Sequence, residues 1–334
     1  MPWRLIISSR MNIQKFAQEA GVSSATVSRA FHEPEKLKEK TRERVLSLAA
    51  KFGYYPDPSG RALVRGRHEV LGLIWPLEAE GSQAVFAHRI LALLTDQLVK
   101  NDLDLLICPI HRDQIATLDH AHRTLRRSRC DAWILLYPRR NDPLTEPLIA
   151  SHKPVVCLMG DALTGAGWKC VKLNQQNWIE DCLRRLNAAG ARSVVLVGGR
   201  AGEPDHEERR RAFESRAPKQ FGNRVTVVAG WPLDEGALLD CLARGEGTGI
   251  IGVDDSAALL ALEVCKKARL TVPKNVKVVG VDDSPLAAMS EPPLSTYRQP
   301  LDEMVECAVD LALGRRRQSR RFDAVFVPRS SLPG

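Results

Sequence analysis

Small, hydroxyl-bearing and basic side chains follow one another along residues 13–29 in a spacing that suits binding to a nucleic acid. Gly21 can adopt the positive φ that a tight turn between two helices requires, and Ser23 can cap the helix that would follow. The small side chain of Ala17 would let the two helices approach closely. Three apolar positions would face inward: Ile13, Val22 and Val27. The segment therefore predicts a helix-turn-helix.

The first residues of the second predicted helix would be exposed, and in a helix-turn-helix such residues enter the major groove of DNA. The candidates for reading bases are Ser24, Ala25 and Arg29. Hydroxyl groups beside the backbone N–H groups of a helix start could hold phosphates. The candidates for this role are Thr26 and Ser28, with Ser23 beside them at the cap. An ordinary hairpin of two helices would explain the glycine and the apolar positions, but not the charge around them.

The net charge of +8 is concentrated near the amino terminus. Residues 1–68 carry 13 Lys and Arg against 6 Asp and Glu, a net charge of +7, whereas residues 69–334 carry 35 against 34, a net charge of +1. A basic module joined to a near-neutral body is typical of a chain that binds a polyanion, because Lys and Arg displace counterions from phosphates. A basic surface that is merely solvated is the alternative.

The 334 residues are too many for one compact core, and they divide into segments of different pattern. Residues 11–55 show three short helical patterns without strand-like alternation, which predicts a separate all-helical module. Residues 55–67 are rich in Pro, Gly and Arg and predict a hinge or linker.

From residue 69 onward, apolar runs of strand length alternate with stretches in which apolar residues recur every three or four positions. Helical stretches such as 87–100, 177–189 and 256–268 separate the runs. The runs are 70–75, 103–108, 132–137, 154–159, 194–197, 225–229, 249–253, 276–281 and 324–327. Nearly continuous hydrophobic strands predict parallel sheets covered by helices on both faces, in two doubly wound subdomains with a cleft between them.

The eight cysteines are scattered without a C-x-x-C pair, so we expect reduced thiols and neither disulfides nor a metal site. No stretch approaches the roughly 18 consecutive apolar residues of a membrane span, and the apolar group at 5–7 is too short for a signal peptide. We therefore expect the protein to stay in the cytoplasm.

The sequence contains few features of an enzyme, although doubly wound α/β folds host many reactions. The segment Gly198-Gly-Arg-Ala-Gly202 lacks the G-x-G-x-x-G spacing, and the chain contains no G-x-x-x-x-G-K-[ST], H-E-x-x-H or G-x-S-x-G motif, so we expect no catalytic site and no cofactor. His120 and His122 have the wrong spacing for two metal ligands on a helix, and the arginine-rich run 315–321 predicts a solvated loop. A free-standing small-molecule receptor would need a secretion signal and no DNA-binding module.

The motifs Ala20-Gly-Val-Ser-x-x-Thr-Val-Ser-Arg29 and Lys40-Thr-Arg-Glu-Arg-Val-Leu-Ser closely resemble the lactose-repressor/galactose-repressor (LacI/GalR) family of bacterial transcriptional regulators. The resemblance continues in Val272-Pro-Lys-Asn-Val-Lys-Val-Val-Gly-Val-Asp282, in Pro292-Pro-Leu-Ser-Thr-Tyr-Arg-Gln299 and in Val327-Pro-Arg-Ser-Ser. It covers the chain beyond an extension at residues 1–10.

The resemblance implies a helix-turn-helix domain at 11–56, a hinge helix at 57–67 and a periplasmic-binding-protein-like core at 68–334 that binds an effector and dimerises. The chain would cross between the two core subdomains near 160–170, 296–300 and 323. Two such domains in a homodimer would bind a pseudo-palindromic operator, and a small effector, often a sugar, would alter that binding. The family contains both induced and corepressor-dependent repressors, so the sign of the effect stays open.

The resemblance also extends the DNA-contacting set to Tyr54, Arg61 and Leu63. In the family, a hinge-helix leucine at the position of Leu63 wedges into the minor groove at the centre of the operator. The alternative is that Leu63 is simply an apolar linker residue. Asp57 and Gly60 depart from the Asn and Ala that are usual in the family, and the glycine lowers helix propensity by about 1 kcal/mol.

In the core, the resemblance implies an effector held by Arg209 and Asp282. A guanidinium and a carboxylate can both pair with neighbouring hydroxyl groups, and an aromatic ring can cover the apolar face of the ligand. The other implied effector-binding residues are Phe86, Trp231 and Asp255. Ala212 and Asp254 replace the usual Gly and Asn. The alternatives are a solvated helix face for the arginine, helix caps for the two aspartates and packing for the two aromatic residues.

Replacing Leu63 with Ala should weaken binding to the operator much more than binding to non-specific DNA, because only a bent operator accepts the wedge. Electrophoretic shifts with the two duplexes measure both affinities. Equal losses on both DNAs would remove the wedge from the mechanism.

Overall fold

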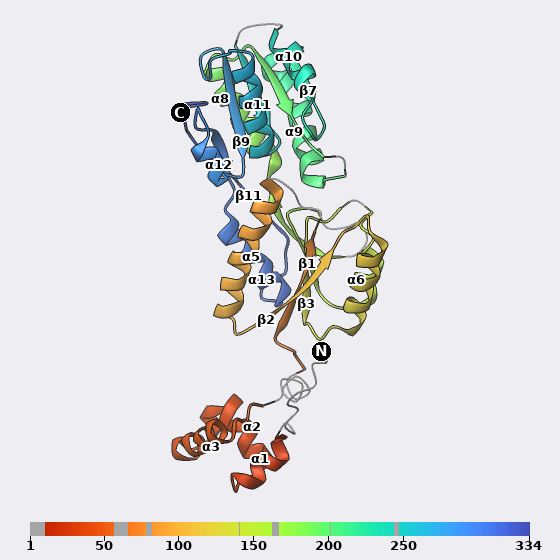
Figure 1. Ribbon diagram of the computed structural model, residues 1–334, viewed down its shortest axis with the longest axis vertical. Helices are drawn as coiled ribbons and strands as arrows, with labels where there is room; N and C mark the ends of the chain where they lie inside the picture. The colour runs from red at the N-terminus through yellow and green to blue at the C-terminus, as the bar shows by residue number, and fades with distance from the viewer. Residues whose placement is uncertain are drawn as a thin grey trace, which may run out of the picture. The chain divides into compact units, whose positions relative to one another are not determined.

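The computed structural model describes residues 11–56, 66–77, 82–139, 141–161, 167–200, 202–243 and 247–334, with the side chains of 82 and 83 excepted. The chain forms two compact units, Met1–Glu69 and Val70–Gly334 (Figure 1). Each unit has its own hydrophobic core.

The first unit is all helical where the structure describes it, as the sequence predicts. Its elements are α1 (Ile13–Glu19), α2 (Ser24–His32), the 3-10 helix η1 (Pro34–Lys36) and α3 (Glu39–Phe52). Phe16 is fully buried and stacks on the ring of Tyr54, with 4.2 Å between the ring centroids. Gly53 ends α3 with a φ of 61°, a left-handed conformation that suits glycine.

The second unit contains two six-stranded sheets, which define its two lobes. The sheet of the first lobe has the order β11-β5-β4-β3-β1-β2, and all its pairs are parallel. Its strands are β1 (Val70–Pro76), β2 (Asp104–Ile110), β3 (Ala132–Leu136), β4 (Val155–Leu158), β5 (Lys169–Leu173) and β11 (Arg320–Phe322).

The sheet of the second lobe has the order β12-β10-β9-β8-β6-β7 and is parallel except for the edge pair β10–β12. Its strands are β6 (Ser193–Val197), β7 (Val225–Val228), β8 (Thr248–Gly252), β9 (Val276–Val281), β10 (Ser295–Arg298) and β12 (Val325–Val327). The predicted doubly wound α/β architecture is therefore confirmed.

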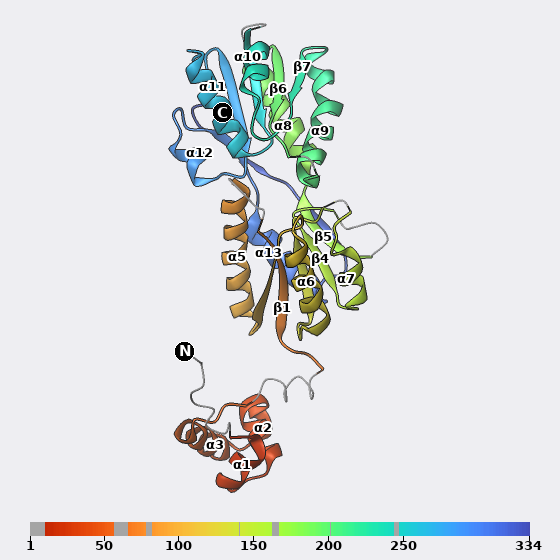
Figure 2. The ribbon, with the colours of Figure 1, turned by 45° about the vertical axis from the view of Figure 1, so that its right-hand side comes forward.

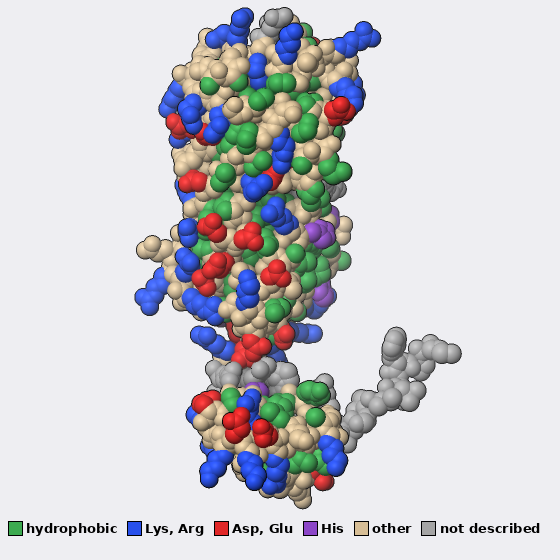
Figure 3. Space-filling model, turned by 90° about the vertical axis from the view of Figure 1, so that its left-hand side faces the viewer, with side chains coloured by type: hydrophobic (Ala, Val, Ile, Leu, Met, Phe, Trp, Pro, Cys, Tyr) green, Lys and Arg blue, Asp and Glu red, His purple; other side chains and the backbone are tan. Residues whose placement is uncertain are grey.

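Helices cover both faces of the first-lobe sheet (Figure 2). One face packs against α5 (Ser82–Lys100) and α13 (Leu301–Ala312), and the other against α6 (Ile115–Arg127) and α7 (Thr145–Ala150). The helices of the second lobe are α8 (Gln175–Ala188), α9 (Pro204–Phe221), α10 (Glu235–Ala243), α11 (Asp255–Lys267) and α12 (Pro285–Met289). The visible face of this unit mixes basic and acidic side chains (Figure 3), which agrees with the near-neutral charge of residues 69–334.

Three connections join the lobes, at 173–175, 298–301 and 322–325. The first lies later than the predicted 160–170, because the sequence analysis missed β5. This strand carries the polar pattern Lys169-Cys-Val-Lys172, yet Lys172 is buried, with ion pairs to Asp161 at 2.5 Å and Glu208 at 2.9 Å.

Two other strands, β10 and β11, also escaped prediction because they carry polar residues, which are buried in β10 and exposed in β11. Ser295 and Thr296 of β10 are fully buried, and their hydroxyl groups donate hydrogen bonds within the core, to Leu332 and to Asp255 among others. The expectation of a solvated loop at 315–321 was wrong at its end, because Arg320 and Arg321 belong to the edge strand β11. Their side chains are exposed while Phe322 is buried.

Candidate DNA-binding face and candidate ligand pocket

Helix α2 begins as its sequence predicts. Ser23 caps it, and the Ser23 hydroxyl accepts a hydrogen bond from the backbone N–H of Thr26 at 3.1 Å. The two hydroxyl oxygens lie 2.9 Å apart, so both already have a partner within the turn. Gly21 has a φ of 65° and forms the turn before the helix.

The amino-terminal part of α2 has both exposed and half-buried side chains. Ala25 and Arg29 are exposed, whereas Ser24, Thr26 and Ser28 are half-buried. These residues lie within two turns of one helix, so the structure brings the predicted base-reading and phosphate-holding candidates together. Arg44, which the sequence analysis did not single out, donates a hydrogen bond to the Ala20 carbonyl at 2.9 Å and so ties α3 to the turn.

The other predicted DNA contacts are placed differently. The ring of Tyr54 is buried in the core of the first unit, with the residue only 4% exposed, so its ring serves packing. Arg61 and Leu63 lie outside the described residues, as do the departures Asp57 and Gly60.

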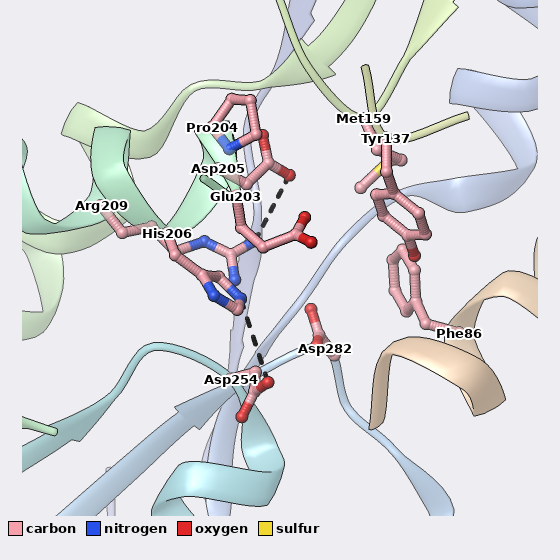
Figure 4. Close-up of a pocket in the computed structure, with 10 residues that line it drawn as sticks. All are labelled: Phe86, Tyr137, Met159, Glu203, Pro204, Asp205, His206, Arg209, Asp254 and Asp282. Carbon is pink, nitrogen blue, oxygen red and sulfur yellow. Dashed lines mark ion pairs between the residues drawn. The ribbon is translucent and has the colours of Figure 1, made fainter. Parts of the chain in front are cut away.

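The second unit contains a pocket between its two lobes, with an empty volume of about 410 Å³ that includes space open to solvent. Figure 4 shows its walls. The first lobe contributes Phe86, Tyr137 and Met159. The second lobe contributes Glu203, Pro204, Asp205, His206, Arg209, Asp254 and Asp282.

Four of these residues follow the carboxyl end of a parallel strand, where ligands bind in open α/β sheets. Tyr137 follows β3, Met159 follows β4, Asp254 lies two residues after β8, and Asp282 follows β9. Tyr137, Met159 and Asp282 have positive φ values of 49°, 64° and 121°. Residues other than glycine rarely adopt such conformations, and they cluster at ligand-binding sites.

Arg209 is the central polar residue of the pocket and is only 3% exposed. Its Nε donates to Oε1 of Gln175 at 3.0 Å, its Nη1 donates to the carbonyl of Val253, and its Nη2 lies 3.9 Å from Oδ2 of Asp205. Arg209 therefore does not lie on a solvated helix face, but the next two residues do. Arg210 and Arg211 are exposed and pair with glutamates of the same helix.

Burial shifts the acid–base behaviour of the pocket. It raises the pKa of Asp205 to about 7, against the opposing attraction of Arg209. It also raises the pKa of Asp282 well above its usual value, although Gln299 donates to Oδ1 of this residue at 2.7 Å. Burial and the nearby positive charge of Arg209 lower the pKa of His206 to about 4. This imidazole is therefore neutral at pH 7.

Charged pairs also connect the two lobes beside the pocket. Arg139 follows β3 in the first lobe, and its Nη2 lies 3.4 Å from Oε1 of Glu203. Lys172 of β5 reaches Glu208 on α9 of the second lobe.

The pocket brings together three of the five predicted effector-binding residues: Phe86, Arg209 and Asp282. Asp255 is fully buried outside it, and its carboxylate accepts hydrogen bonds from the Thr296 hydroxyl at 2.6 Å and the Ser284 N–H at 2.7 Å. Trp231 is half-buried against the second-lobe core, with the guanidinium of Arg200 5.0 Å from its ring. These contacts favour the packing alternative for Trp231, whereas Asp255 neither lines the pocket nor caps α11, whose cap is Asp254.

Several lining residues were not predicted from the sequence: Tyr137, Met159, Glu203, Pro204, Asp205 and His206. Asp254 was noted only as a departure from the family. The available signal was position, because Tyr137 and Met159 are the last residues of predicted strands and the others begin the helix that carries Arg209.

Within the described part of the chain, no group of three or more His, Cys, Asp or Glu residues could hold a metal ion. Nor is any described helix long and apolar enough to cross a membrane.

Replacing Asp205 with Asn should raise the melting temperature at pH 8 but not at pH 4. The folded pKa of about 7 exceeds the ordinary value of 3.8, so the stability from the protonated acid is complete below pH 3.8 and disappears as the pH rises through 7. The free energy of unfolding that this pKa shift can contribute is at most about 4 kcal/mol. Thermal denaturation across this range measures it. Glu214→Gln, on the exposed side of the same helix, is the control, and a pH-independent difference for Asp205→Asn would contradict the assignment.

Comparison with known proteins identifies two domains. Residues 12–57 match the family described as "Bacterial regulatory proteins, lacI family", and residues 183–332 match a "Periplasmic binding protein-like domain". The transcriptional regulator GalS of Salmonella typhimurium is 25% identical over 91% of this chain and 89% of its own length. The ribose operon repressor of Bacillus subtilis is 26% identical over 90% of each chain.

Among solved structures, a lac repressor dimer bound to operator and the anti-inducer ONPF superimposes with a TM-score of 0.77 at 18% identity, over 97% of this chain and 99% of that one. This similarity concerns the fold. The chain therefore carries a lacI-family DNA-binding domain followed by a periplasmic binding protein-like domain, and over nine-tenths of its length it is similar to bacterial transcriptional regulators such as GalS.

Proposed function

We propose that the protein binds a pseudo-palindromic operator as a homodimer and represses transcription under the control of a small ligand held between its lobes. The observation that carries the proposal is the presence, in one chain, of an exposed helix start suited to DNA and a separate buried polar pocket suited to a metabolite. Since the target is DNA, the protein would act in the cytoplasm.

The start of α2 supports sequence-specific binding. Arg29 can pair with a guanine edge, while the short side chains of Ser24 and Ala25 let the helix approach the bases closely. Such small side chains read few bases, so useful specificity needs two half-sites and therefore two copies of the chain. The lac repressor in the similar structure is likewise a dimer on its operator.

The pocket supports a polar, hydroxyl-bearing ligand such as a sugar or a related metabolite. The guanidinium of Arg209 and the carboxylate of Asp282 can bind neighbouring hydroxyl groups, and Phe86 and Tyr137 offer aromatic faces opposite them (Figure 4). One relative is named for the ribose operon, which agrees with such a ligand.

The ligand would control the distance and angle between the lobes. The ion pairs Arg139–Glu203 and Lys172–Glu208 already cross from lobe to lobe, so ligand contacts on both sides of the pocket would favour the closed state further. A tenfold change in operator affinity requires about 1.4 kcal/mol of coupling between the sites. Both induction and corepression satisfy this requirement.

An enzyme or a small-molecule receptor without a regulatory role would be built on the same core fold. We propose the regulator and no catalytic activity, because the relatives that span most of the chain are transcriptional regulators and the chain carries their DNA-binding domain.

Selection of bound sequences from random duplex DNA tests the proposal directly. We expect the full-length protein to enrich a pseudo-palindrome with a pyrimidine–purine step at its centre, where DNA kinks most easily. If nothing is enriched, the selection is repeated with a metabolite pool to supply a corepressor. A second failure, or enrichment of a single half-site, would contradict the dimeric regulator.

Replacing Arg209 with Ala should abolish the response of operator binding to those metabolites that affect the wild-type protein. The loss of a charge-assisted hydrogen bond should weaken such a ligand by about 10- to 100-fold. Operator affinity is titrated by electrophoretic shift with and without each metabolite. Arg210→Ala, one position along α9 and exposed, should respond like the wild type. An unchanged titration for Arg209→Ala would show that the pocket is not the control site.

A further inference from the structure

A buried ion pair of the first lobe contacts the backbone of the pocket wall. Arg112 follows β2, the edge strand of the first-lobe sheet, and its Nε donates to Oδ2 of Asp142 at 2.8 Å. The two side chains are only 3% and 0% exposed. A buried ion pair adds little stability by itself, because both charges lose their water, and apolar residues in its place are often equally stable. A role other than stability is therefore the question.

Arg112 reaches the backbone of a residue that lines the pocket. Its Nη2 donates to the carbonyl of Leu136 at 3.2 Å and to that of Tyr137 at 3.1 Å. These two residues lie at the end of β3, and β1 separates β3 from β2. Tyr137 has a φ of 49°, a left-handed conformation that residues other than glycine keep only where their surroundings enforce it. The hydrogen bonds from Arg112 supply such an enforcement.

Asp142 connects the same ion pair to the boundary between the lobes. Its Oδ2 accepts from the N–H of Arg139 at 3.3 Å, and its Oδ1 accepts from the N–H of Leu144 at 3.0 Å. The N–H of Asp142 in turn donates to the Arg139 carbonyl at 3.2 Å. The guanidinium of Arg139 lies 3.4 Å from the carboxylate of Glu203 in the second lobe. Asp142 thus fixes the backbone from which the ion pair between the lobes is made.

The contacts of Arg112 need the geometry of a guanidinium. This group presents its N–H donors in one rigid plane, so it can bind a carboxylate and two carbonyls at the same time. A lysine ammonium group is a compact charge on a flexible stem and cannot hold that arrangement. Neither Arg112 nor Asp142 lines the pocket, so their influence on a ligand would pass through the residues that they hold.

We propose that Arg112 and Asp142 are positioning residues of the ligand site. Arg112 holds Tyr137 in the pocket wall. Asp142 holds Arg139 within reach of Glu203. Loss of the ion pair would release the strained peptide of Tyr137 and the backbone of Arg139 together. This role rests on the proposed function of the pocket as the ligand site of the regulator.

Fluorine NMR of the full-length protein, labelled with 3-fluorotyrosine, tests this role without DNA or metabolite. The chain has four tyrosines, and Tyr137→Phe assigns the resonance of interest. We expect this resonance to shift or to split in Arg112→Lys, which keeps a positive charge beside Asp142 but loses the planar donors. The resonance of Tyr297, which is buried in the second-lobe core, should stay in place.

A double replacement separates positioning from stability. Arg112→Met alone leaves a buried carboxylate without its cationic partner and should lower the melting temperature by about 10 °C. Combining Arg112→Met with Asp142→Leu should recover most of this loss, because apolar groups then replace both charges. The Tyr137 resonance should nevertheless remain displaced in the double variant. Arg123→Met, an exposed change on α6, is the control and should alter neither quantity.

The contact between the lobes has its own measurement. A double-mutant cycle with Arg139→Ala and Glu203→Gln, followed by denaturant unfolding, gives the coupling between these two residues. We expect a favourable coupling in the wild-type background and its loss in the background of Arg112→Met with Asp142→Leu. A coupling that survives would overturn the part of the proposal that concerns Arg139.

The part that concerns Tyr137 fails if its resonance is unchanged in both Arg112→Lys and the double variant. It fails equally if the resonance recovers together with the melting temperature. A double variant that does not fold would assign the ion pair to folding alone and would overturn the whole proposal. The DNA selection decides separately whether the protein is a regulator.

Discussion

A single buried guanidinium holds together the second-lobe side of the pocket. Burying a charge is costly unless hydrogen bonds replace the water that it loses, and Arg209 obtains them from elements far apart in sequence. It lies on α9, donates to Gln175 at the start of α8, and donates to Val253 at the end of β8. Gln175 in turn accepts from the indole of Trp178 at 2.6 Å. The spacing of α8, α9 and β8 is thereby fixed before any ligand binds.

The same constraint shapes the boundary between the lobes. Lys172 is 1% exposed, and its ammonium group is satisfied only because Asp161 of its own lobe and Glu208 of the other lobe converge on it. Opening the lobes would separate this ammonium group from Glu208 and admit water to both groups. Closed lobes thus pair groups that opening would separate, and a difference of this kind between two arrangements is what allosteric control requires.

The hydrophobic pattern of the sequence was enough to predict the doubly wound architecture and most strands, because parallel strands buried on both faces are nearly continuous apolar runs. It failed where polar residues are buried with distant partners. Lys172 in β5 and Thr296 in β10 look like surface residues until Glu208 and Asp255 are placed beside them. No local pattern contains that information.

The candidate sites divide in the same way. The turn and cap of the helix-turn-helix depend only on neighbouring residues. Gly21 forms the turn and Ser23 caps α2, as the sequence predicts. In the pocket, the resemblance to a family located Arg209 and Asp282, but it also selected Trp231, whose ring packs against the second-lobe core. Residues such as His206 and Asp254 became informative only when the distance between them and the neutral state of His206 were known.

The connections between the lobes also determine when each part of the chain can fold during synthesis. The first lobe consists of residues 70–173 together with α13 and β11, and α13 supplies Met304, Val305 and Ala308 to its core. On the ribosome, this helix emerges only after residues 174–298, which make up nearly all of the second lobe. The first lobe must therefore wait, partly assembled and with apolar surface uncovered, for its own last segment. The DNA-binding unit, made of local contacts near the amino terminus, can fold long before either lobe is complete.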